Sequence, residues 1–381
     1  MISCYTEKFK EYFGGAEAFS FWKARVALYA VLKALGVGAG DEVILPGYTC
    51  VMDVNPIKYL GAKPVYVDIE PDTFNMNVGL LEEKISPATK VIIAQHTYGY
   101  VCDIDRIIEI AARHNIAVIE DCCLCFGSTY KGRLAGTMGV ASYFSGQWNK
   151  PFTTGLGGVA VCFDEKLASR MRDICKNELI EPSFKEKMML AAQFYVYKAF
   201  IYPRTTALAQ SAFRWLTKKG IVVGSSSTAE FTPVMAPDFF KAMSGLQAGW
   251  GCGQLSKVDA NISHRRKMAL LYDKLLAEKG WYPRRYDNST QDPVMVRYPV
   301  RIDRKDDAME MAAAAGVELG SWFECPLHPI ETPLDKYDYT IGVCPQAEKA
   351  SKEVVNLPLH PRVSEATVRR TVDFITQFKQ M

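Results

Sequence analysis

The sequence predicts an α/β protein with a large, mainly parallel mixed sheet covered by helices, followed by a smaller α+β region. Strand-like and helix-like segments alternate along the N-terminal part of the chain. The strand candidates are continuous apolar runs, which is typical of sheets buried on both faces. From residue 255 onward the pattern changes to a long amphipathic helix followed by short strand candidates. We therefore expect a large domain over residues 1–250 and a small one over residues 251–381.

The alternating segments can be assigned in order along the chain. Apolar residues at helical spacing predict a helix over residues 24–35, which Gly36 and Gly38 end. After it the sequence predicts a strand over 42–45, a helix over 49–59, a strand over 64–68, a helix over 78–85, a strand over 90–94, a helix over 103–114 and a strand over 116–120. Residues 1–22 are rich in aromatic side chains and show no strong pattern.

Residues 182–220 interrupt this alternation. They are typical of two amphipathic helices split at Pro203, with seven basic residues and a single acidic one. We favour a helical insertion in the large domain, with one face on the core and a solvated basic rim. A basic wall for an acidic substrate, or contact with an anionic membrane surface, stays open as an alternative. The polar residues 224–228 that follow predict a loop.

The C-terminal part has its own pattern. Residues 257–280 predict a long amphipathic helix, and residues 294–300 predict short strands. Two more helices are expected over residues 306–315 and 365–378. Together these segments predict the smaller α+β domain.

Composition excludes several classes of protein. The 381 residues have a formal net charge of +3 and are 49% hydrophobic and 23% charged, as in an ordinary soluble globular protein. This balance does not suggest nucleic-acid binding. The N-terminus shows no basic-then-apolar leader, and the nearest candidate for a membrane span, residues 188–202, is short and interrupted by Lys198. We therefore expect a cytoplasmic protein without a transmembrane segment.

Eleven cysteines is a high count, but their positions do not indicate a disulfide framework. Cys122, Cys123, Cys125 and Cys162 lie in or beside apolar runs. The first three lack the usual spacing of zinc ligands, and the sequence shows no second cluster near them. We expect reduced, buried thiols and no metal site.

The stretch from residue 142 to 161 carries the strongest indication of chemistry. One apolar run ends at Ser145, Lys150 follows five residues later between Trp148 and Pro151, and a second apolar run begins after a glycine-rich string. A lysine buried at such a joint would have a lowered pKa, which leaves the amine free for Schiff-base chemistry. A surface turn residue is the simpler interpretation of one such lysine.

A second candidate, Asp121, ends the apolar run before it. Ligands of parallel sheets bind at the carboxyl ends of strands, so Asp121 and the stretch around Lys150 are expected to converge. A desolvated lysine and a strand-end carboxylate are the pair that pyridoxal 5'-phosphate (PLP) requires, because the lysine holds the aldehyde and the aspartate keeps the pyridine nitrogen protonated. A helix cap is the alternative interpretation of Asp121 alone.

Several longer strings resemble the DegT/DnrJ/EryC1/StrS family of PLP-dependent (sugar) aminotransferases. They occur in the family's order and span nearly the whole chain, so the resemblance is specific. The strings are GVGAGDEVILPGYT, GAKPVYVDIEPDTFN, the HTYG–DID pair, AVIEDCCLCFGSTYKGRLAGTMG, the stretch around Lys150, SGLQAGWGCGQLSKVD and CPQAEKASKEVVNLPLHP. The resemblance implies the fold type I PLP-transferase architecture, which is like that of aspartate aminotransferase.

The resemblance also assigns residues to roles. Lys150 matches the lysine that forms the Schiff base, and Asp121 matches the partner of the pyridine nitrogen. Ser145 matches a phosphate ligand. Ala24 and Arg25 match a small-residue pair whose backbone N–H groups bind phosphate at a helix N-terminus.

The chain departs from the family at other positions. The family usually has an aromatic residue stacked on the PLP ring at the position of Cys50, and only the nearby Tyr48 could substitute for it here. Leu124 stands where a Gln or His commonly bonds the ring hydroxyl, and Leu156 replaces the acid of a Gly-acid-Gly-Gly string. The family's phosphate-touching asparagine from the neighbouring subunit has no assigned counterpart. We expect the cofactor to bind with altered surroundings.

The resemblance implies transfer of an amino group from an amino acid, usually glutamate, to a nucleotide-linked keto sugar. It also implies a homodimer and a place in polysaccharide or amino-sugar biosynthesis. Lys150 would be nucleophile and general base in turn. Two alternatives stay open: amination of a non-sugar ketone such as a cyclitol, and a PLP-binding regulator without turnover. The presence of both Lys150 and Asp121 argues against the second.

Overall fold

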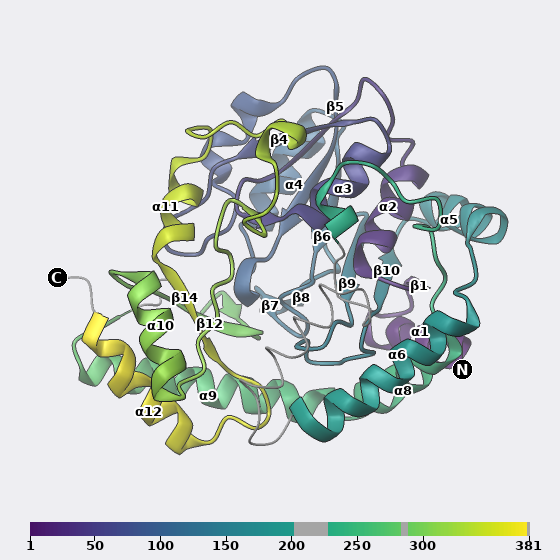
Figure 1. The fold of residues 1–381 in the computed structure, drawn as a ribbon. Coiled ribbons are helices and arrows are strands. Elements are labelled where there is room, and N and C mark those ends of the chain that lie inside the picture. Colours follow the sequence, from purple (N-terminus) through teal and green to yellow (C-terminus); the bar gives the residue numbers. More distant parts are fainter. Residues whose placement is uncertain (202–227, 283–288, 379–381) are drawn as a thin grey trace.

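A central sheet organises the structure, a computed structural model that describes residues 1–201, 228–282 and 289–378. The sheet has seven strands in the order β1-β10-β9-β6-β5-β2-β4, with helices packed around it (Figure 1). Neighbours from β4 to β9 pair in parallel, whereas β10 pairs antiparallel with both β9 and β1. The strands are β1 (Glu17–Phe21), β2 (Glu42–Pro46), β4 (Lys63–Val67), β5 (Thr89–Gln95), β6 (Ala117–Asp121), β9 (Ala141–Ser145) and β10 (Gly158–Cys162). The predicted fold class is confirmed.

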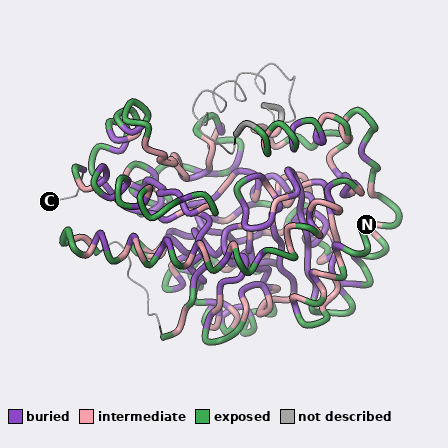
Figure 2. Tube along the Cα trace, turned by 90° about the horizontal axis from the view of Figure 1, so that it is seen from below, coloured by how far each residue is buried: buried purple, intermediate pink, exposed green. Residues whose placement is uncertain are grey.

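Both faces of this sheet are buried. Along β5, Val91 and Ile93 belong to one hydrophobic cluster, whereas Ile92 and Ala94 belong to another. Because side chains alternate along a strand, these clusters lie on opposite faces. Figure 2 shows buried residues concentrated in the middle of the molecule and exposed ones on the outer turns. The helices of this part are α1 (Ile2–Tyr12), α2 (Ala24–Ala34), α3 (Val51–Tyr59), α4 (Ile104–Arg113), α5 (Glu165–Glu178), α6 (Phe184–Val196) and α8 (Gly245–Leu255).

The C-terminal part contributes a second, smaller sheet and further helices. β12 (Arg297–Arg301) pairs antiparallel with β14 (Val354–Pro358). The helices are α9 (Val258–Glu278), α10 (Lys305–Ala315), α11 (Pro345–Glu353) and α12 (Glu365–Ile375). In Figure 1 this part lies on the side of the molecule away from α1 and α5. The domain boundary near residue 250 stays a prediction.

Short strands join the two parts of the chain. β13 (Leu327–His328) pairs in parallel with β3 (Thr49–Cys50), next to the start of α3. β11 (Gln291–Asp292) pairs with β7 (Thr129–Tyr130), which also pairs with β8 (Arg133–Leu134). Short helical turns complete the chain: η1 (Val78–Leu80), η2 (Glu82–Lys84), η3 (Thr97–Gly99), the π-helical η4 (Tyr197–Ile201), η5 (Thr228–Phe231), η6 (Leu334–Tyr337) and η7 (Thr376–Phe378). Among the described residues, no helix is both long and apolar enough to cross a membrane.

The predicted helix over residues 78–85 is wrong. The segment forms two 3₁₀ turns, η1 and η2, and its buried side chains are Val78 in η1 and Leu81 between the two turns. Residues three apart share a face of a 3₁₀ helix, which has three residues per turn. Asn77 also accepts a hydrogen bond from the backbone N–H of Gly79, which satisfies this first turn locally. The apolar spacing was too short to distinguish this arrangement from an α-helix.

Two elements near the N-terminus were not predicted. α1 buries only Tyr5 and Phe9, and Tyr5 packs closely against Gly251 of α8. β1 is the edge strand beside β10, and only Ala18 and Phe21 of it are buried. Elements that bury so few side chains are stabilised by partners far away in the sequence, so their own apolar patterns are weak.

The predicted helical insertion is described only in part. α6 and η4 cover residues 184–201, and α6 begins with a capping box between Ser183 and Glu186. The second predicted helix lies mostly in residues 202–227, outside the described residues. The same holds for nearly all of the predicted loop at 224–228.

Gly158 permits the close approach of β10 to the start of α2. A Cβ atom there would lie 2.4 Å from Ala24 Cα and 2.4 Å from the carbonyl oxygen of Lys23. Gly158→Ala should therefore lower the free energy of unfolding by about 1–3 kcal/mol, as overpacking does. Gly253→Ala in α8, where nothing lies within 4 Å, is the matched control and should be neutral or slightly stabilising. Urea unfolding would contradict this packing if both variants had the wild-type midpoint.

Candidate active site

A cavity of about 250 Å³ opens at the carboxyl ends of the parallel strands. Three strand ends reach it through their last residues: Gln95 of β5, Asp121 of β6 and Ser145 of β9. The start of α2 and the segment containing Trp322 line other walls. The structure therefore brings together residues that the sequence placed at separate strand ends.

Lys150 lies in this cavity with 7% of its surface exposed. Its backbone N–H donates to the carbonyl of Gln147 at 2.9 Å, and its Nζ lies 5.2 Å from the centre of the Trp322 ring. Burial lowers the pKa of the amine, while nearby Cys123 and Asp121 partly oppose that shift. A larger fraction of neutral amine is therefore available at a given pH than on an exposed lysine.

Asp121 is the last residue of β6 and is 4% exposed. Parallel pairing aligns it with Gln95 on one side and Tyr143 on the other. The backbone N–H of Cys123 donates to its Oδ1 at 2.9 Å, which orients the carboxylate. Asp121 and Lys150 thus line the same cavity, as predicted.

The start of α2 forms a positively charged wall of the cavity. Ala24 and Arg25 line it together with Lys23, whose side chain does not cap the helix. Arg25 Nη1 lies 2.7 Å and Lys23 Nζ 3.0 Å from Oε1 of Glu230. Burial and the neighbouring Arg25 lower the pKa of Lys23 to about 8. A helix N-terminus with two cations suits an anionic group.

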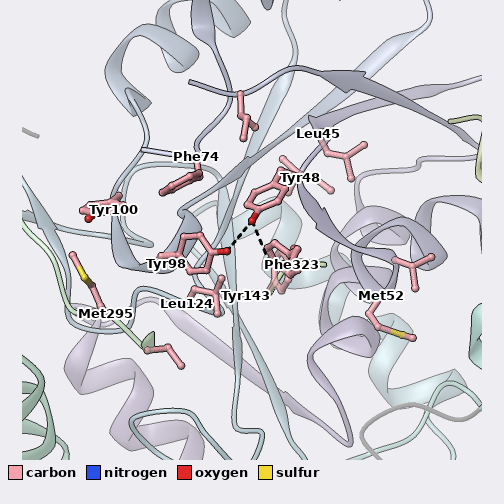
Figure 3. Close-up of a cluster of buried hydrophobic side chains, with 14 of the residues drawn as sticks. Leu45, Tyr48, Met52, Phe74, Tyr98, Tyr100, Leu124, Tyr143, Met295 and Phe323 are labelled. Carbon is pink, nitrogen blue, oxygen red and sulfur yellow. Dashed lines mark hydrogen bonds between the residues drawn. The ribbon is translucent and has the colours of Figure 1, made fainter. Parts of the chain in front are cut away.

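The structure does not bring Tyr48 to the cavity. Its ring is fully buried, and its hydroxyl lies 3.0 Å from that of Tyr98 and accepts a hydrogen bond from the backbone N–H of Phe323 (Figure 3). Cys50 does line the cavity, and burial raises the pKa of its thiol to about 12. The wall near it also includes Leu124, one of the departures noted above.

Sequence reasoning missed several residues of the cavity, and two of them, Trp322 and Asp53, bear on its chemistry. Trp322 supplies an aromatic face opposite the Lys150 amine, although it lies far along the chain. Asp53, in the first turn of α3, adds a second carboxyl group beside Asp121. The sequence offered one signal for Asp53, an acid three residues after Cys50 in a segment whose neighbouring side chains, Met52 and Val54, are apolar.

The insertion packs against the loop that contains Lys150. Phe194 stacks on Trp250 with ring centres 3.9 Å apart and also contacts Trp148. The hydroxyl of Tyr197 donates to the carbonyl of Trp148 at 3.3 Å. The described basic residues of the insertion, Lys185, Lys187 and Lys198, are not among the residues that line the cavity. Over its described residues, the insertion therefore contacts the loop of Lys150 without lining the cavity.

A cluster of buried polar side chains surrounds Glu120, the residue before Asp121 in β6. His96 Nε2 is 3.0 Å from Glu120 Oε2, and Nδ1 of His96 accepts from the backbone N–H of Cys102 at 3.3 Å. The structure brings Cys122 and Cys125 within 4.8 Å of this ring, a proximity that the sequence did not reveal. Both cysteines are free thiols, and burial raises the pKa of each of them, which favours the protonated thiol. The absence of a metal site stays a prediction.

Comparison with known proteins identifies the family. The sequence profile of the DegT/DnrJ/EryC1/StrS aminotransferase family matches residues 2–194 and 207–376. The chain is 30% identical over 381 residues to a GDP-perosamine synthase of Caulobacter vibrioides, covering 98% of this chain and 88% of the relative. It is 30% identical over 354 residues to an L-glutamine:2-deoxy-scyllo-inosose aminotransferase of Streptomyces kanamyceticus, covering 91% and 74%. The chain therefore belongs to the DegT/DnrJ/EryC1/StrS aminotransferase family.

A solved structure agrees with this assignment. The crystal structure of the aminotransferase TlmJ from Streptoalloteichus hindustanus matches with a TM-score of 0.76 and 25% identity, covering 99% of this chain and 90% of that one. The predicted family, fold type and enzyme class are confirmed. The roles of the individual site residues stay predictions.

Phe194 should contribute to stability through its contacts with the Lys150 loop. It is 8% exposed, and Phe194→Ala should lower the free energy of unfolding by about 3 kcal/mol because it removes buried aromatic surface. Phe184 begins the same helix but is 79% exposed, so Phe184→Ala should change the value by no more than about 0.5 kcal/mol. Equal urea midpoints for the two variants would show that α6 does not pack on this loop.

Proposed function

We propose that the protein is a PLP-dependent aminotransferase that moves an amino group from an amino acid, glutamate, to a nucleotide-linked keto sugar. The observation that supports this most is a buried lysine and a strand-end carboxylate in one cavity, beside a cationic helix N-terminus. The name of the Caulobacter vibrioides relative, a GDP-perosamine synthase, supports a nucleotide-sugar acceptor.

The residues of the cavity fit this cofactor. Lys150 would hold the aldehyde, and Asp121 would pair with the pyridine nitrogen. The start of α2, with Ala24 and Arg25, and the hydroxyl of Ser145 would hold the phosphate. The thiol of Cys50 would contact the cofactor, in place of the aromatic residue that Tyr48 does not supply. PLP supplies an electron sink that makes loss of a proton from the substrate carbon possible.

The chain's own groups then perform three tasks. Lys150, with its lowered pKa, accepts a proton from the substrate carbon and returns it to the neighbouring position. The carboxyl group of Asp121, which the backbone N–H of Cys123 orients, would stabilise a proton on the pyridine nitrogen. The rings of Trp322 and Phe323 cover one wall of the cavity and exclude water from the reacting atoms.

A cyclitol-type ketone remains the second candidate for the acceptor. The relative from Streptomyces kanamyceticus is named for such a substrate and is also 30% identical. The altered positions Cys50 and Leu124 both line the cavity, so the cofactor's surroundings differ from the family pattern. A regulator without turnover is the third candidate. Binding of PLP would not distinguish it from an enzyme, because both would bind the cofactor.

The assembly is proposed to be a cytoplasmic homodimer. Exposed apolar side chains on α6, such as Phe184, Met188 and Tyr195, offer surface that a second copy could cover. Contact of the insertion with a membrane surface remains a weaker alternative.

Lys150 should be the lysine that holds the cofactor. Borohydride reduction of the PLP-loaded protein followed by peptide mapping should label Lys150, and Lys150→Ala should abolish the label and the yellow colour. Lys23 is a strict internal comparison, because it lines the same cavity and also has a lowered pKa. The exposed Lys267 of α9 provides the surface control, Lys267→Ala. A label on Lys23 instead of Lys150 would contradict the assignment.

The acceptor can be identified by product mass. With glutamate as donor, nucleotide-linked keto sugars should gain an amino group, whereas cyclitol ketones should not react. Turnover of cyclitols alone would favour the second candidate, and conversion of the cofactor to its amine form without any product would favour the regulator. Sedimentation of the same preparation should give the mass of a dimer.

A further inference from the structure

Asp53 is a carboxyl group that the roles assigned above do not use. It lies in the first turn of α3, half-buried, and lines the cavity together with Asp121 and Lys150. The hydroxyl of Tyr143 donates to its Oδ1 at 3.0 Å. Its Oδ2 lies 3.1 Å from Oγ1 of Thr49. These two contacts hold both carboxyl oxygens.

The hydrogen bonds around Thr49 show where its proton points. The side-chain amide nitrogen of Gln95 lies 3.0 Å from the carbonyl oxygen of Tyr48, an atom that can only accept. That contact orients the amide, so Gln95 Oε1 must accept from Thr49 Oγ1, 2.6 Å away. A hydroxyl has a single proton to donate. The 3.1 Å contact between Thr49 and Asp53 is therefore a good hydrogen bond when Asp53 itself carries the proton.

We propose that Asp53 is a positioning residue of the active site that carries a proton on Oδ2, beside the carboxyl group of Asp121. Asp53 then donates from Oδ2 to Thr49 and accepts from Tyr143 at Oδ1. The effect of Asp53 on the pyridine ring rests on the proposed function, because it requires bound PLP. The protonated state itself follows from contacts within the chain.

Electrostatics supports the same assignment. Burial and the neighbouring Asp121 raise the pKa of Asp53 to about 7, and the hydrogen bond that Tyr143 donates opposes that shift. The start of α3 also favours the ionised form. Within the described part of the chain, the charged or titratable groups that interact electrostatically with Asp53 are Arg25, Cys50, Asp121, Cys123, Tyr143 and Lys150.

Protonation of Asp53 would set the charge that faces the cofactor. Below its pKa, Asp53 adds no charge to the cavity. Above its pKa, Asp53 adds a negative charge, which favours the protonated form of the Lys150 nitrogen, whether free or bound to the cofactor. The charge of the site is therefore expected to change near neutral pH.

Infrared titration of the cofactor-free protein tests the protonated state directly. The carbonyl band of a neutral carboxyl group should disappear as the pH rises through about 7, and Asp53→Asn should lack this change. The amide of Asn can keep both hydrogen bonds, so this variant should fold normally. Tyr143→Phe removes a donor that favours the ionised form, so the wild-type midpoint should move to higher pH. A band that does not depend on Asp53 would overturn the proposal.

The PLP-loaded protein tests the consequence. The pH at which its visible absorbance changes should be lower in Asp53→Asn than in the wild type, by on the order of one unit. Equal transitions in both proteins would overturn the proposed effect on the ring. Failure of the wild type to take up PLP would contradict the proposed function instead, and the infrared result would still decide the state of Asp53.

Discussion

Removal of the Lys150 amine from water is the constraint on which the site depends. An ammonium group is costly to bury, so its surroundings must either supply compensating charge or favour the neutral amine. In this chain burial lowers its pKa while Asp121 and Cys123 oppose the shift. The sheet provides this environment because β6 and β9 are parallel neighbours, and their ends bring Asp121 and Ser145 to one cavity.

Opposite charges line the cavity on different elements. Lys23 and Arg25 contribute positive charge at the start of α2, where both contact Glu230. Asp121 and Asp53 contribute carboxyl groups from β6 and α3, and Lys150 lies in the same cavity. Positive groups suit a phosphate and a carboxylate suits a protonated ring nitrogen, so the cavity offers partners for both parts of the proposed cofactor.

Much of the fold could be predicted from the sequence because its signals are local. The strands β2, β4, β5 and β6 are continuous apolar runs, and their alternation with helices predicted a mainly parallel sheet. α1 and β1 could not be predicted, since each buries few side chains and depends on distant partners. The segment at 78–85 shows a further limit, because an i, i+3 pair such as Val78 and Leu81 fits both an α-helix and a 3₁₀ turn.

The site also contains residues that the sequence could predict and residues that it could not. Lys150 and Asp121 were predictable because each follows a buried strand and matches a family motif. Tyr48 was chosen for its nearness to Cys50 in the sequence, but Phe323 and Tyr98 draw its side chain into the core. Trp322 reaches the cavity only through the fold of the C-terminal part. The role of Asp53 required hydrogen bonds to Thr49 and Tyr143 that no spacing in the sequence could show.

The stacking of Phe194 on Trp250 joins three distant parts of the chain beneath the loop of the reactive lysine. Any attempt to shorten the enzyme by deleting α6 would expose Trp148, and with it the backbone that orients the lysine. A minimal version would therefore need a new apolar lid in place of that helix.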